Sequence, residues 1–278
     1  MDVLLSHLQN RDIIVPYFGV HPWFSHLFYL DSAEKPDKRA HYNRVLKPTP
    51  SEDLLAVLPE PMSLSQHSRR SEEIIAKYKL ARFGVGEIGL DKLFRVPNAG
   101  FLGNPAYGKA ADIANDEVDK LSKSRVSIQH QMDVFRYQLK LAERLNRQVS
   151  VHCVKAHGVL YDEMMKFPSL TVLLHSYTGS IDQARRWIKS KKQQALFFSF
   201  SNWINGEKLQ LLELLATELD RGQILTESDI YIDRLFTHDK HAEYFNHLVG
   251  IYAKLNNYID LDASQIESNM LASINASS

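Results

Sequence analysis

Short apolar runs alternate with longer amphipathic segments along most of the chain. The runs are rich in β-branched and aromatic residues and predict six strands, at 13–20, 82–86, 149–151, 170–174, 196–200 and 223–225. The segments between them have apolar residues three or four positions apart, which predicts helices with buried faces that carry Phe135, Leu139 and Ala142; Leu211, Leu214 and Leu215; and Phe245, Leu248 and Tyr252. Strands that alternate with helices favour right-handed βαβ units, so we expect an α/β fold with a parallel sheet.

Two polar segments interrupt this alternation. Residues 92–124 contain several proline, glycine and asparagine residues and lack a sustained period, which predicts a long insert after the second strand. Residues 31–51 are rich in basic residues and proline, and are interpreted as a solvated loop or, less readily, as a basic flap over a substrate. Because no internal repeat is present, we expect one domain over 1–278 with the insert at about 92–124.

The composition limits the kinds of partner that the chain can have. Lysine plus arginine number 33, as do aspartate plus glutamate, so the net charge gives no sign of a nucleic-acid coat. Any phosphate substrate must therefore be held locally. Cys153 is the only cysteine, which excludes an intrachain disulfide and a thiolate zinc cluster. With no signal-like leader and no membrane-length apolar run, we expect a cytoplasmic or nuclear protein without a membrane partner.

Residues that can bind a metal ion follow the predicted strands. The apolar runs end in turn at His21, Glu87, His152, His175 and Asp229. The C-terminal ends of parallel strands meet at one edge of a sheet, and in a barrel they form the rim where active sites lie, so these polar ends favour a barrel over an open sheet. Imidazole and carboxylate groups without thiolate suit Mg²⁺, Mn²⁺ or Zn²⁺, with positions left for water and substrate.

Each of these residues has a simpler explanation when it is taken alone. A single histidine after a strand is commonly a hydrogen-bonded core residue, and an aspartate after serine, as at Asp229, is commonly a helix N-cap. The recurrence of a metal-capable residue in five of the six predicted units favours a shared site. Cys153, beside His152, is interpreted as a small buried residue and not as a nucleophile.

Five short motifs carry a resemblance to a known family: Gly-Val-His-Pro at 19–22, Gly-Glu-Ile-Gly-Leu-Asp at 86–91, Val-His-Cys at 151–153, His-Ser-Tyr-Thr-Gly at 175–179 and Thr-Glu-Ser-Asp at 226–229. In this order they resemble the signatures of the TatD-like deoxyribonucleases, and residues 131–142 resemble the helix before the family's histidine–cysteine strand. The resemblance implies a (β/α)₈ TIM-type barrel of the metal-dependent hydrolase kind. It also implies metal-dependent hydrolysis of phosphodiester bonds in DNA.

The resemblance assigns roles to the residues at the strand ends. Glu87 resembles the carboxylate that two divalent metal ions share, while His152 and His175 resemble ligands of the second ion. Asp229 resembles a ligand of the first ion and the catalytic group that orients or deprotonates the attacking water. Glu227 is interpreted as a residue that holds neighbouring site residues in position without binding a metal ion itself. Two adjacent ions can stabilise both the attacking and the leaving oxygen of an in-line displacement.

A second set of residues is predicted to contact the substrate. His21 resembles a rim histidine close to substrate. Thr178 and Gly179 precede a predicted helix at 181–189, whose first backbone amides can bind a phosphate. N-capping of this helix by Ser180 explains the same sequence equally well. Asn202 follows the fifth predicted strand and is a candidate nucleotide contact. Trp203 can stack on a base, but packing under a loop is the favoured interpretation.

The sequence also departs from the family pattern. Family members open with a strand that ends in a His-x-His pair, which supplies two ligands of the first ion, and this sequence has no such pair. Residues 1–11 predict a helix that leads into a strand like the family's third, so we expect the first strands to be missing. Of two expected ions, this form would hold only one well and would be nearly inactive. Val154 and Lys155 stand where the family has a polar or charged pair, and no proline follows Asp229.

Three functions are consistent with these observations. The first is a TatD-like deoxyribonuclease, an exonuclease that acts on single-stranded or frayed DNA ends. The second is hydrolysis of another phosphoester or of a cyclic amide at the same rim, because one fold hosts many chemistries. The third is a catalytically impaired barrel that serves as an interaction protein with an unidentified protein partner. The missing first-metal pair favours the third, whereas the retained ligand set favours hydrolysis, and we place the deoxyribonuclease first.

Overall fold

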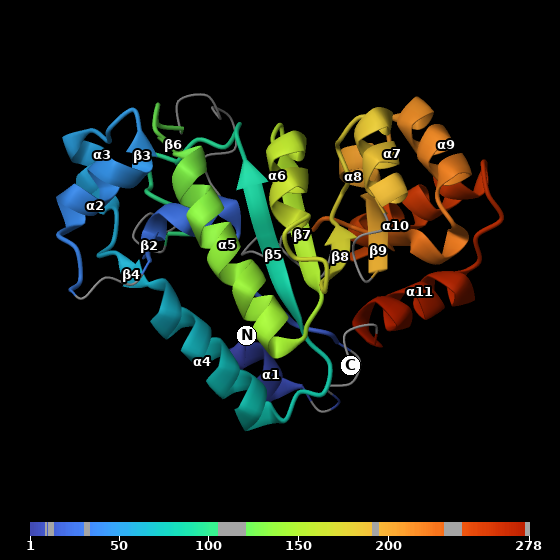
Figure 1. Cartoon of the computed structure of the whole chain (residues 1–278), viewed down its shortest axis with the longest axis horizontal. Coiled ribbons are helices and arrows are strands. Elements are labelled where there is room, and N and C mark those ends of the chain that lie inside the picture. Colours follow the sequence, from blue (N-terminus) through green and yellow to red (C-terminus); the bar gives the residue numbers. More distant parts are fainter. Residues whose placement is uncertain are drawn as a thin grey trace. The chain divides into compact units, whose positions relative to one another are not determined.

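The computed structural model describes residues 1–8, 10, 14–30, 34–104, 121–190, 195–230 and 241–275 of the chain. These residues belong to two compact units, Met1–Leu141 and Ala142–Ser278, called unit 1 and unit 2 below. Figure 1 shows the elements of both units, coloured along the sequence. In each unit, helices alternate with parallel strands, which confirms the predicted α/β class with a parallel sheet.

Unit 1 contains one long strand with several short strands and helices around it. Strand β1 pairs in parallel with β5, β2 pairs in parallel with β4, and β3 pairs antiparallel with β6. Its elements are α1 (Asp2–His7), β1 (Tyr17–Phe18), η1 (Pro22–Leu27), β2 (Phe28–Tyr29), α2 (Lys38–Val45), β3 (Leu46–Lys47), α3 (Glu52–Val57), β4 (Met62–Ser63), α4 (Leu64–Tyr78), β5 (Gly84–Asp91), β6 (Arg125–Val126) and most of α5 (Ile128–Leu145).

The helices of unit 1 begin where the sequence supplies a capping side chain. The side chains of Asp37, Ser51 and Ser63 accept hydrogen bonds from backbone N–H groups in the first turns of α2, α3 and α4. Helix α5 lies beside β5 in Figure 1 and is tied to the strand region by two buried glutamines. Gln131 bonds both backbone groups of Asp91, and Gln138 bonds both backbone groups of Val20. These bonds fix the end of the Glu87 strand and the backbone that follows β1.

Unit 2 is built on four parallel strands in the order β7, β8, β9, β10. The register places Leu174 beside both Val151 and Phe198, and Ser201 beside Glu227, so the C-terminal ends of these strands lie along one edge. The elements are β7 (Val149–Val154), α6 (His157–Met164), β8 (Thr171–Leu174), α7 (Ile181–Ser190), β9 (Ala195–Ser201), α8 (Asn202–Asn205), α9 (Leu209–Glu218), η4 (Arg221–Gln223), β10 (Ile224–Glu227), α10 (His241–Asn256) and α11 (Ala263–Asn275).

Two strands run further than the sequence predicts. Because Ile88 and Leu90 are fully buried, the apolar alternation of β5 continues past Gly86, and Glu87 lies inside the strand. His152 likewise lies inside β7, with Cys153 and Val154 after it. The prediction that these two residues end their strands was therefore wrong. The placement of His175 directly after β8 and of Asp229 two residues after β10 is confirmed.

The predicted buried faces are correct for α5 and only partly correct for α9 and α10. Phe135, Leu139 and Ala142 of α5 are buried as predicted. In α10, by contrast, Phe245 is 63% exposed and Leu248 is 36% exposed, while the buried positions are Ile251 and Leu255. In α9 the buried residues are Leu212, Leu215 and Ala216. Apolar spacing gives the period of a helix, but the neighbouring sheet decides which of several apolar stripes faces inward.

The two polar segments are more ordered than predicted. Residues 38–45 form α2, where Tyr42 is fully buried, so 31–51 is not a simple solvated loop. The described ends of the 92–124 insert pair with each other: the Val96 N–H donates to the Ser124 carbonyl, and the Ser122 N–H donates to the Val96 carbonyl. Residues 105–120 of the insert, residues 31–33 and the start of the strand predicted at 13–20 lie outside the described residues. No helix in the described part of the chain is long and apolar enough to cross a membrane.

Candidate metal centre

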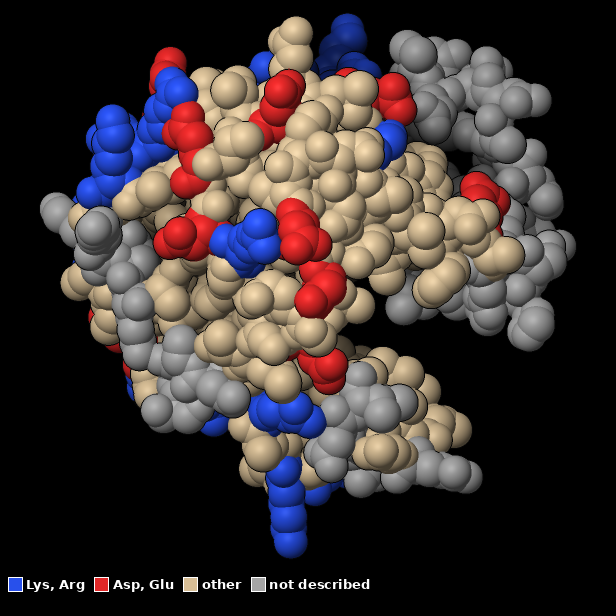
Figure 2. Space-filling model, turned by 90° about the vertical axis from the view of Figure 1, so that its right-hand side faces the viewer, with Lys and Arg blue, Asp and Glu red and all other residues tan. Residues whose placement is uncertain are grey.

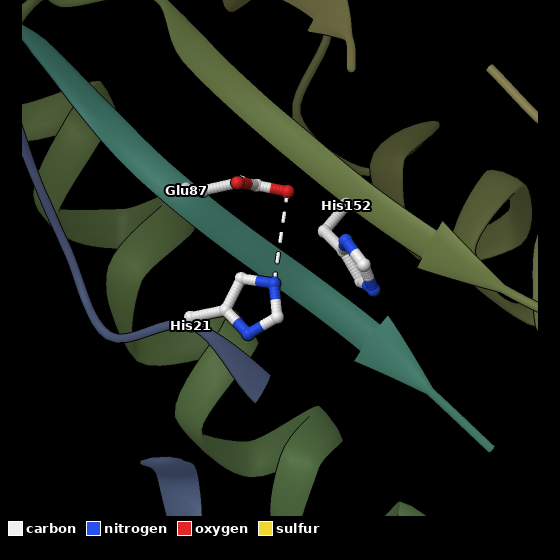
Figure 3. Close-up of side chains that lie close together, drawn as sticks. All are labelled: His21, Glu87 and His152. Atoms are coloured by element: carbon white, nitrogen blue, oxygen red, sulfur yellow. Dashed lines mark ion pairs between the residues drawn. The ribbon is translucent and has the colours of Figure 1, made fainter. Parts of the chain in front are cut away.

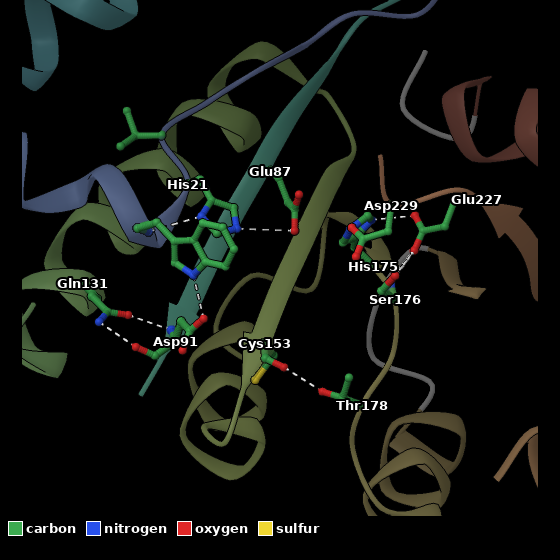
Figure 4. A network of polar contacts seen from close by, with 12 residues as sticks. His21, Glu87, Asp91, Gln131, Cys153, His175, Ser176, Thr178, Glu227 and Asp229 are labelled. Carbon is green, nitrogen blue, oxygen red and sulfur yellow. Dashed lines mark hydrogen bonds and ion pairs between the residues drawn. The ribbon is translucent and has the colours of Figure 1, made fainter. Parts of the chain in front are cut away.

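The centre of unit 2 is a histidine held between two carboxylates. His175 follows β8 directly, and its Nδ1 atom lies 2.6 Å from Glu227 Oε2 while its Nε2 atom lies 2.9 Å from Asp229 Oδ1. The three side chains are 15%, 18% and 28% exposed in that order, so the cluster is shielded but open to small molecules. Figure 4 shows these side chains meeting from the ends of β8 and β10, the strands on either side of β9. The structure therefore brings three of the predicted site residues together within one unit.

Glu227 is held by backbone and hydroxyl donors. The Ser176 N–H donates to Glu227 Oε1 at 2.7 Å, and the Ser176 hydroxyl donates to the same oxygen at 2.5 Å. The Ser176 hydroxyl also lies 2.9 Å from the Ser201 hydroxyl at the end of β9. Since one carboxylate oxygen binds Ser176 and the other faces His175, Glu227 fixes the orientation of the imidazole ring. Ser176 was not predicted as a site residue, although it lies within the His-Ser-Tyr-Thr-Gly motif at 175–179.

The residues after these strands have an unusual backbone conformation. Lys155, Ser176 and Asp229 follow β7, β8 and β10, and all three have positive φ angles, of 55°, 38° and 55°. A side chain in this left-handed region costs about 1–2 kcal/mol for most residue types. Such conformations occur preferentially at functional sites, where the surrounding structure holds them. All three lie at the edge of the unit 2 strands that also carries His175.

His152 lies one strand away from this cluster, on β7 (Figure 3). The next residue, Cys153, is buried, as predicted, and its carbonyl accepts a hydrogen bond from the Thr178 hydroxyl at 3.0 Å. His157 Nε2 lies 3.3 Å from the same hydroxyl, and burial, with a smaller effect of Lys155, lowers the pKa of His157 to about 4. His157 therefore stays neutral at physiological pH and holds Thr178 in place.

In unit 1, Glu87 pairs with His21. Their Oε1 and Nε2 atoms are 3.6 Å apart, and both side chains are mostly buried, as Figure 3 shows. The His21 Nδ1 atom accepts the Trp23 N–H at 3.2 Å, so the proton of a neutral ring lies on Nε2 and points toward Glu87. Trp23 in turn donates from its indole to Asp91 at the end of β5. This arrangement makes His21 a donor toward the carboxylate.

Two further predicted substrate residues have structural neighbours of their own. A side chain at Gly179 would collide with the Tyr177 hydroxyl, which explains why glycine is needed there. Helix α7 begins at the predicted place, and Ser180 and Gln183 form a reciprocal cap in its first turn. The Asn202 amide nitrogen lies 3.4 Å from His247 Nδ1 on α10. Trp203 is 70% exposed, so the prediction that it packs under a loop was wrong.

An α/β chain with a half-buried histidine–carboxylate cluster at the C-terminal edge of parallel strands has the features of a metal-binding hydrolase. The chain belongs to the TatD related DNase family, whose sequence model matches residues 3–274, and it is a TatD-family hydrolase. The family resemblance predicted from the motifs is thereby confirmed.

Similar proteins come from yeasts, a bacterium and a protozoan. An uncharacterized deoxyribonuclease of Saccharomyces cerevisiae is 37% identical over 240 residues, covering 83% of this chain and 70% of the yeast protein. The Cut9-interacting protein scn1 of Schizosaccharomyces pombe is 31% identical, covering 78% of this chain and 71% of scn1. Among solved structures, a TatD homologue of Escherichia coli is 18% identical with a TM-score of 0.46, over 94% and 96% of the two chains. A TatD-family hydrolase of Entamoeba histolytica is 11% identical with a TM-score of 0.47, over 76% and 69%.

Proposed function

We propose that this chain is a divalent-metal-dependent phosphodiesterase that cleaves DNA, with Glu87, His152, His175 and Asp229 as its metal ligands. Membership of the TatD related DNase family supports the choice of reaction. The observation that carries the proposal is the position of His175 between Glu227 and Asp229.

The protonation of His175 is the physical reason for expecting a cation. A neutral imidazole has one N–H group, and Glu227 at 2.6 Å from Nδ1 is the better placed acceptor for it. The Nε2 lone pair then faces a carboxylate oxygen of Asp229 at 2.9 Å. Two acceptors at that distance repel each other, so either a second proton or a metal ion must lie between them. A histidine whose far nitrogen is oriented by a carboxylate is a common arrangement in metal sites.

The residues of the cluster have distinct parts in the proposed reaction. Divalent ions held by such ligands supply a Lewis acid for a phosphoryl oxygen and lower the pKa of a water molecule. Asp229, the most exposed member of the unit 2 cluster, is the group that orients that water and accepts its proton. Glu227 and Ser176 hold the His175 ring, and Glu227 does not need to touch substrate. In unit 1, His21 donates toward Glu87 and limits the freedom of that carboxylate.

The finer features of the proposal follow the family resemblance. We expect two divalent ions, of Mg²⁺, Mn²⁺ or Zn²⁺, and exonuclease action on single-stranded or frayed DNA in the cytoplasm or nucleus. His21, Thr178, Gly179 and Asn202 are the proposed substrate contacts. The Thr178 hydroxyl donates its one hydrogen to the Cys153 carbonyl and lies 3.3 Å from His157 Nε2, so it would donate to a phosphate oxygen by exchanging the carbonyl for that oxygen.

The test is cleavage of a labelled DNA strand by the purified chain with each divalent ion in turn. We expect activity with Mg²⁺ or Mn²⁺ that EDTA abolishes and added metal restores. The Glu87→Ala variant should lose far more rate than His21→Ala, because a ligand carboxylate holds the ion whereas the histidine only orients it. Cleavage that is indifferent to chelation, or equal losses in the two variants, would show that the assignment is wrong.

The yeast relatives also support a second candidate function, the binding of a protein partner. One relative at 31% identity is named for its interaction with another protein, Cut9. If this chain acts in the same manner, an Asp229→Asn variant should lose DNA cleavage and keep partner binding. A variant that loses both would favour one shared surface, and a wild-type chain that binds a partner but cleaves no phosphoester would favour the interaction protein.

A further inference from the structure

Trp203 is the most exposed tryptophan of the described residues. It is 70% exposed, whereas Trp187 is 2% exposed. Trp23, the third tryptophan of the chain, stacks on Phe94 and donates its indole N–H to Asp91. An indole offers a large apolar face and one polar N–H group, a combination that suits contact with a ligand. Neither the fold nor the metal ligands explain why a tryptophan stands here.

The position of Trp203 relates it directly to the unit 2 cluster. It lies in α8, two residues after Ser201, the last residue of β9. Ser201 is the register partner of Glu227, and its hydroxyl lies 2.9 Å from the Ser176 hydroxyl that binds Glu227. The Ser201 N–H and the Tyr177 carbonyl are joined through the buried Asn205 side chain. The backbone that carries the indole is therefore tied to the backbone that carries His175.

Helix α10 holds the indole in place from one side. The rings of Trp203 and His247 are 5.2 Å apart at 62°, an edge-to-face contact. The neighbouring Asn202 side chain packs against α10, where a Cβ at Gly250 would come within 3.2 Å of it, closer than most side chains approach. A side chain that is already oriented loses little conformational entropy when a second ring stacks on it.

We propose that Trp203 stacks on an unpaired base of the DNA strand whose backbone enters the His175–Asp229 cluster. The inference rests on the proposed phosphodiesterase function and names the substrate form that the site prefers. Every base has a π-face, so stacking on an aromatic side chain binds single strands without reading their sequence. A base that is paired and stacked in a duplex cannot offer this face, which makes Trp203 select single-stranded or frayed ends.

Basic side chains near the same strand ends suit the backbone of that strand. Lys208 follows α8, and Lys155 follows β7. Among the described residues neither lysine forms an ion pair, and burial together with the charge of Lys155 lowers the pKa of Lys208. A phosphate bound near these lysines would offset the repulsion between their charges.

The test compares three variants in binding to a labelled oligothymidylate and to an abasic strand of the same length, both in EDTA so that no cleavage occurs. Trp203→Leu keeps an apolar side chain without the aromatic face, and Trp203→Phe keeps the face. Phe245→Leu is the matched control, because Phe245 is another exposed aromatic residue of unit 2, at 63% exposure. We expect Trp203→Leu to weaken oligothymidylate binding about tenfold or more while leaving abasic binding unchanged. Trp203→Phe should keep most of the affinity, and Phe245→Leu should keep all of it.

Two outcomes would overturn the inference: equal affinities in Trp203→Leu and wild type, or an equal loss for the abasic strand. An unchanged unfolding midpoint in Trp203→Leu shows that the variant is folded. Failure of the inference is separable from failure of the proposed function. If wild type cleaves DNA and Trp203→Leu does so with the same KM, stacking is refuted and the nuclease stands. If binding depends on Trp203 but no divalent ion supports cleavage, the nuclease is refuted and stacking stands.

Discussion

A group of three histidines in unit 1 and His175 in unit 2 have opposite surroundings. In unit 1, His26, His41 and His130 are 0%, 1% and 8% exposed. Each has its Nε2 atom against a backbone carbonyl, of Gly100 at 2.9 Å, of His26 at 2.8 Å and of Ser25 at 3.0 Å. In unit 2, His175 is half-buried and both of its ring nitrogens face carboxylates. The residue type is the same, but the acceptors around it differ in charge.

This difference separates structural from chemical histidines. Burial lowers the pKa of His26 and His41 to about 4 although the hydrogen bond to a carbonyl raises it, so these side chains act as neutral hydrogen-bond donors in a core. Two carboxylates around one ring instead demand positive charge, which a metal ion can supply. The surface of unit 2 in Figure 2 shows acidic and basic side chains in small groups separated by uncharged surface. The comparison between the two kinds of histidine can be tested residue by residue.

The largest effect is expected from exchanging one histidine of each kind for glutamine. His175→Gln should reduce DNA cleavage by more than about 100-fold, the upper range for residues that only support a ligand, because it removes the ligand itself. The unfolding midpoint should change little. His130→Gln should leave cleavage unchanged in the folded protein and lower stability by about 1–3 kcal/mol, since a buried hydrogen bond is altered.

Cleavage rates at saturating metal and urea unfolding of the same preparations measure the two effects. The comparison fails if His130→Gln impairs cleavage as much as His175→Gln does. A third variant, Glu227→Gln, tests whether the carboxylate orients His175. If it does, metal binding should weaken about 10- to 100-fold, and if it does not, metal binding should stay unchanged.

The sequence predicted part of this contrast. His175 and Asp229 were found because each follows a short apolar run, and a short buried strand has a clear end. Glu87 and His152 were found for the wrong reason, since both lie inside strands whose alternation continues past them. The buried cluster of His26, His41 and His130 was not predicted, because its histidines come from separate segments of the sequence and donate to backbone carbonyls, which no sequence motif indicates.

Orientation was the main feature that the sequence did not provide. The apolar period of α10 is real, yet Phe245 faces solvent while Ile251 and Leu255 are buried. Trp203 was predicted to pack and is exposed for the same reason: a helix of four residues has no period from which its buried face can be read. Tertiary packing decides these directions, and local spacing does not encode it.

A smaller effect is expected when the pH is lowered. The folded pKa values of His26 and His41 are about 4, below the ordinary 6.5 of an unfolded chain, so the unfolded state binds protons first as the pH falls. Stability is then present above pH 6.5 and is lost progressively toward pH 4, by on the order of 1–2 kcal/mol for each histidine at pH 5. Burial is the main cause that lowers the pKa of His130. The hydrogen bond to Ser25 raises this pKa, Arg44 lowers it and Asp133 raises it.

Urea unfolding in EDTA at pH 7, 6 and 5 measures this loss without a contribution from metal binding. His26→Gln, which retains an N–H donor for the Gly100 carbonyl, should show a shallower dependence than wild type. Equal stabilities at pH 7 and pH 5, or an unchanged slope in His26→Gln, would contradict a neutral buried cluster. Because His26 belongs to unit 1, a changed pH dependence of stability in His26→Gln reports on the histidines of that unit.

The smallest effect concerns the start of α7, where a polar pair of unit 2 has a structural role. The Ser180 hydroxyl accepts the Gln183 N–H at 3.3 Å, and Gln183 Oε1 accepts the Ser180 N–H at 2.9 Å. Two of the first-turn amides are therefore already satisfied, and a phosphate bound there would have to displace them. Ser180→Ala should cost about 1 kcal/mol of stability. The KM for DNA should stay at the wild-type value, whereas Thr178→Val, which removes the hydroxyl bound to the Cys153 carbonyl, should raise it. A raised KM in Ser180→Ala would instead show that the start of α7 takes part in substrate binding together with Thr178.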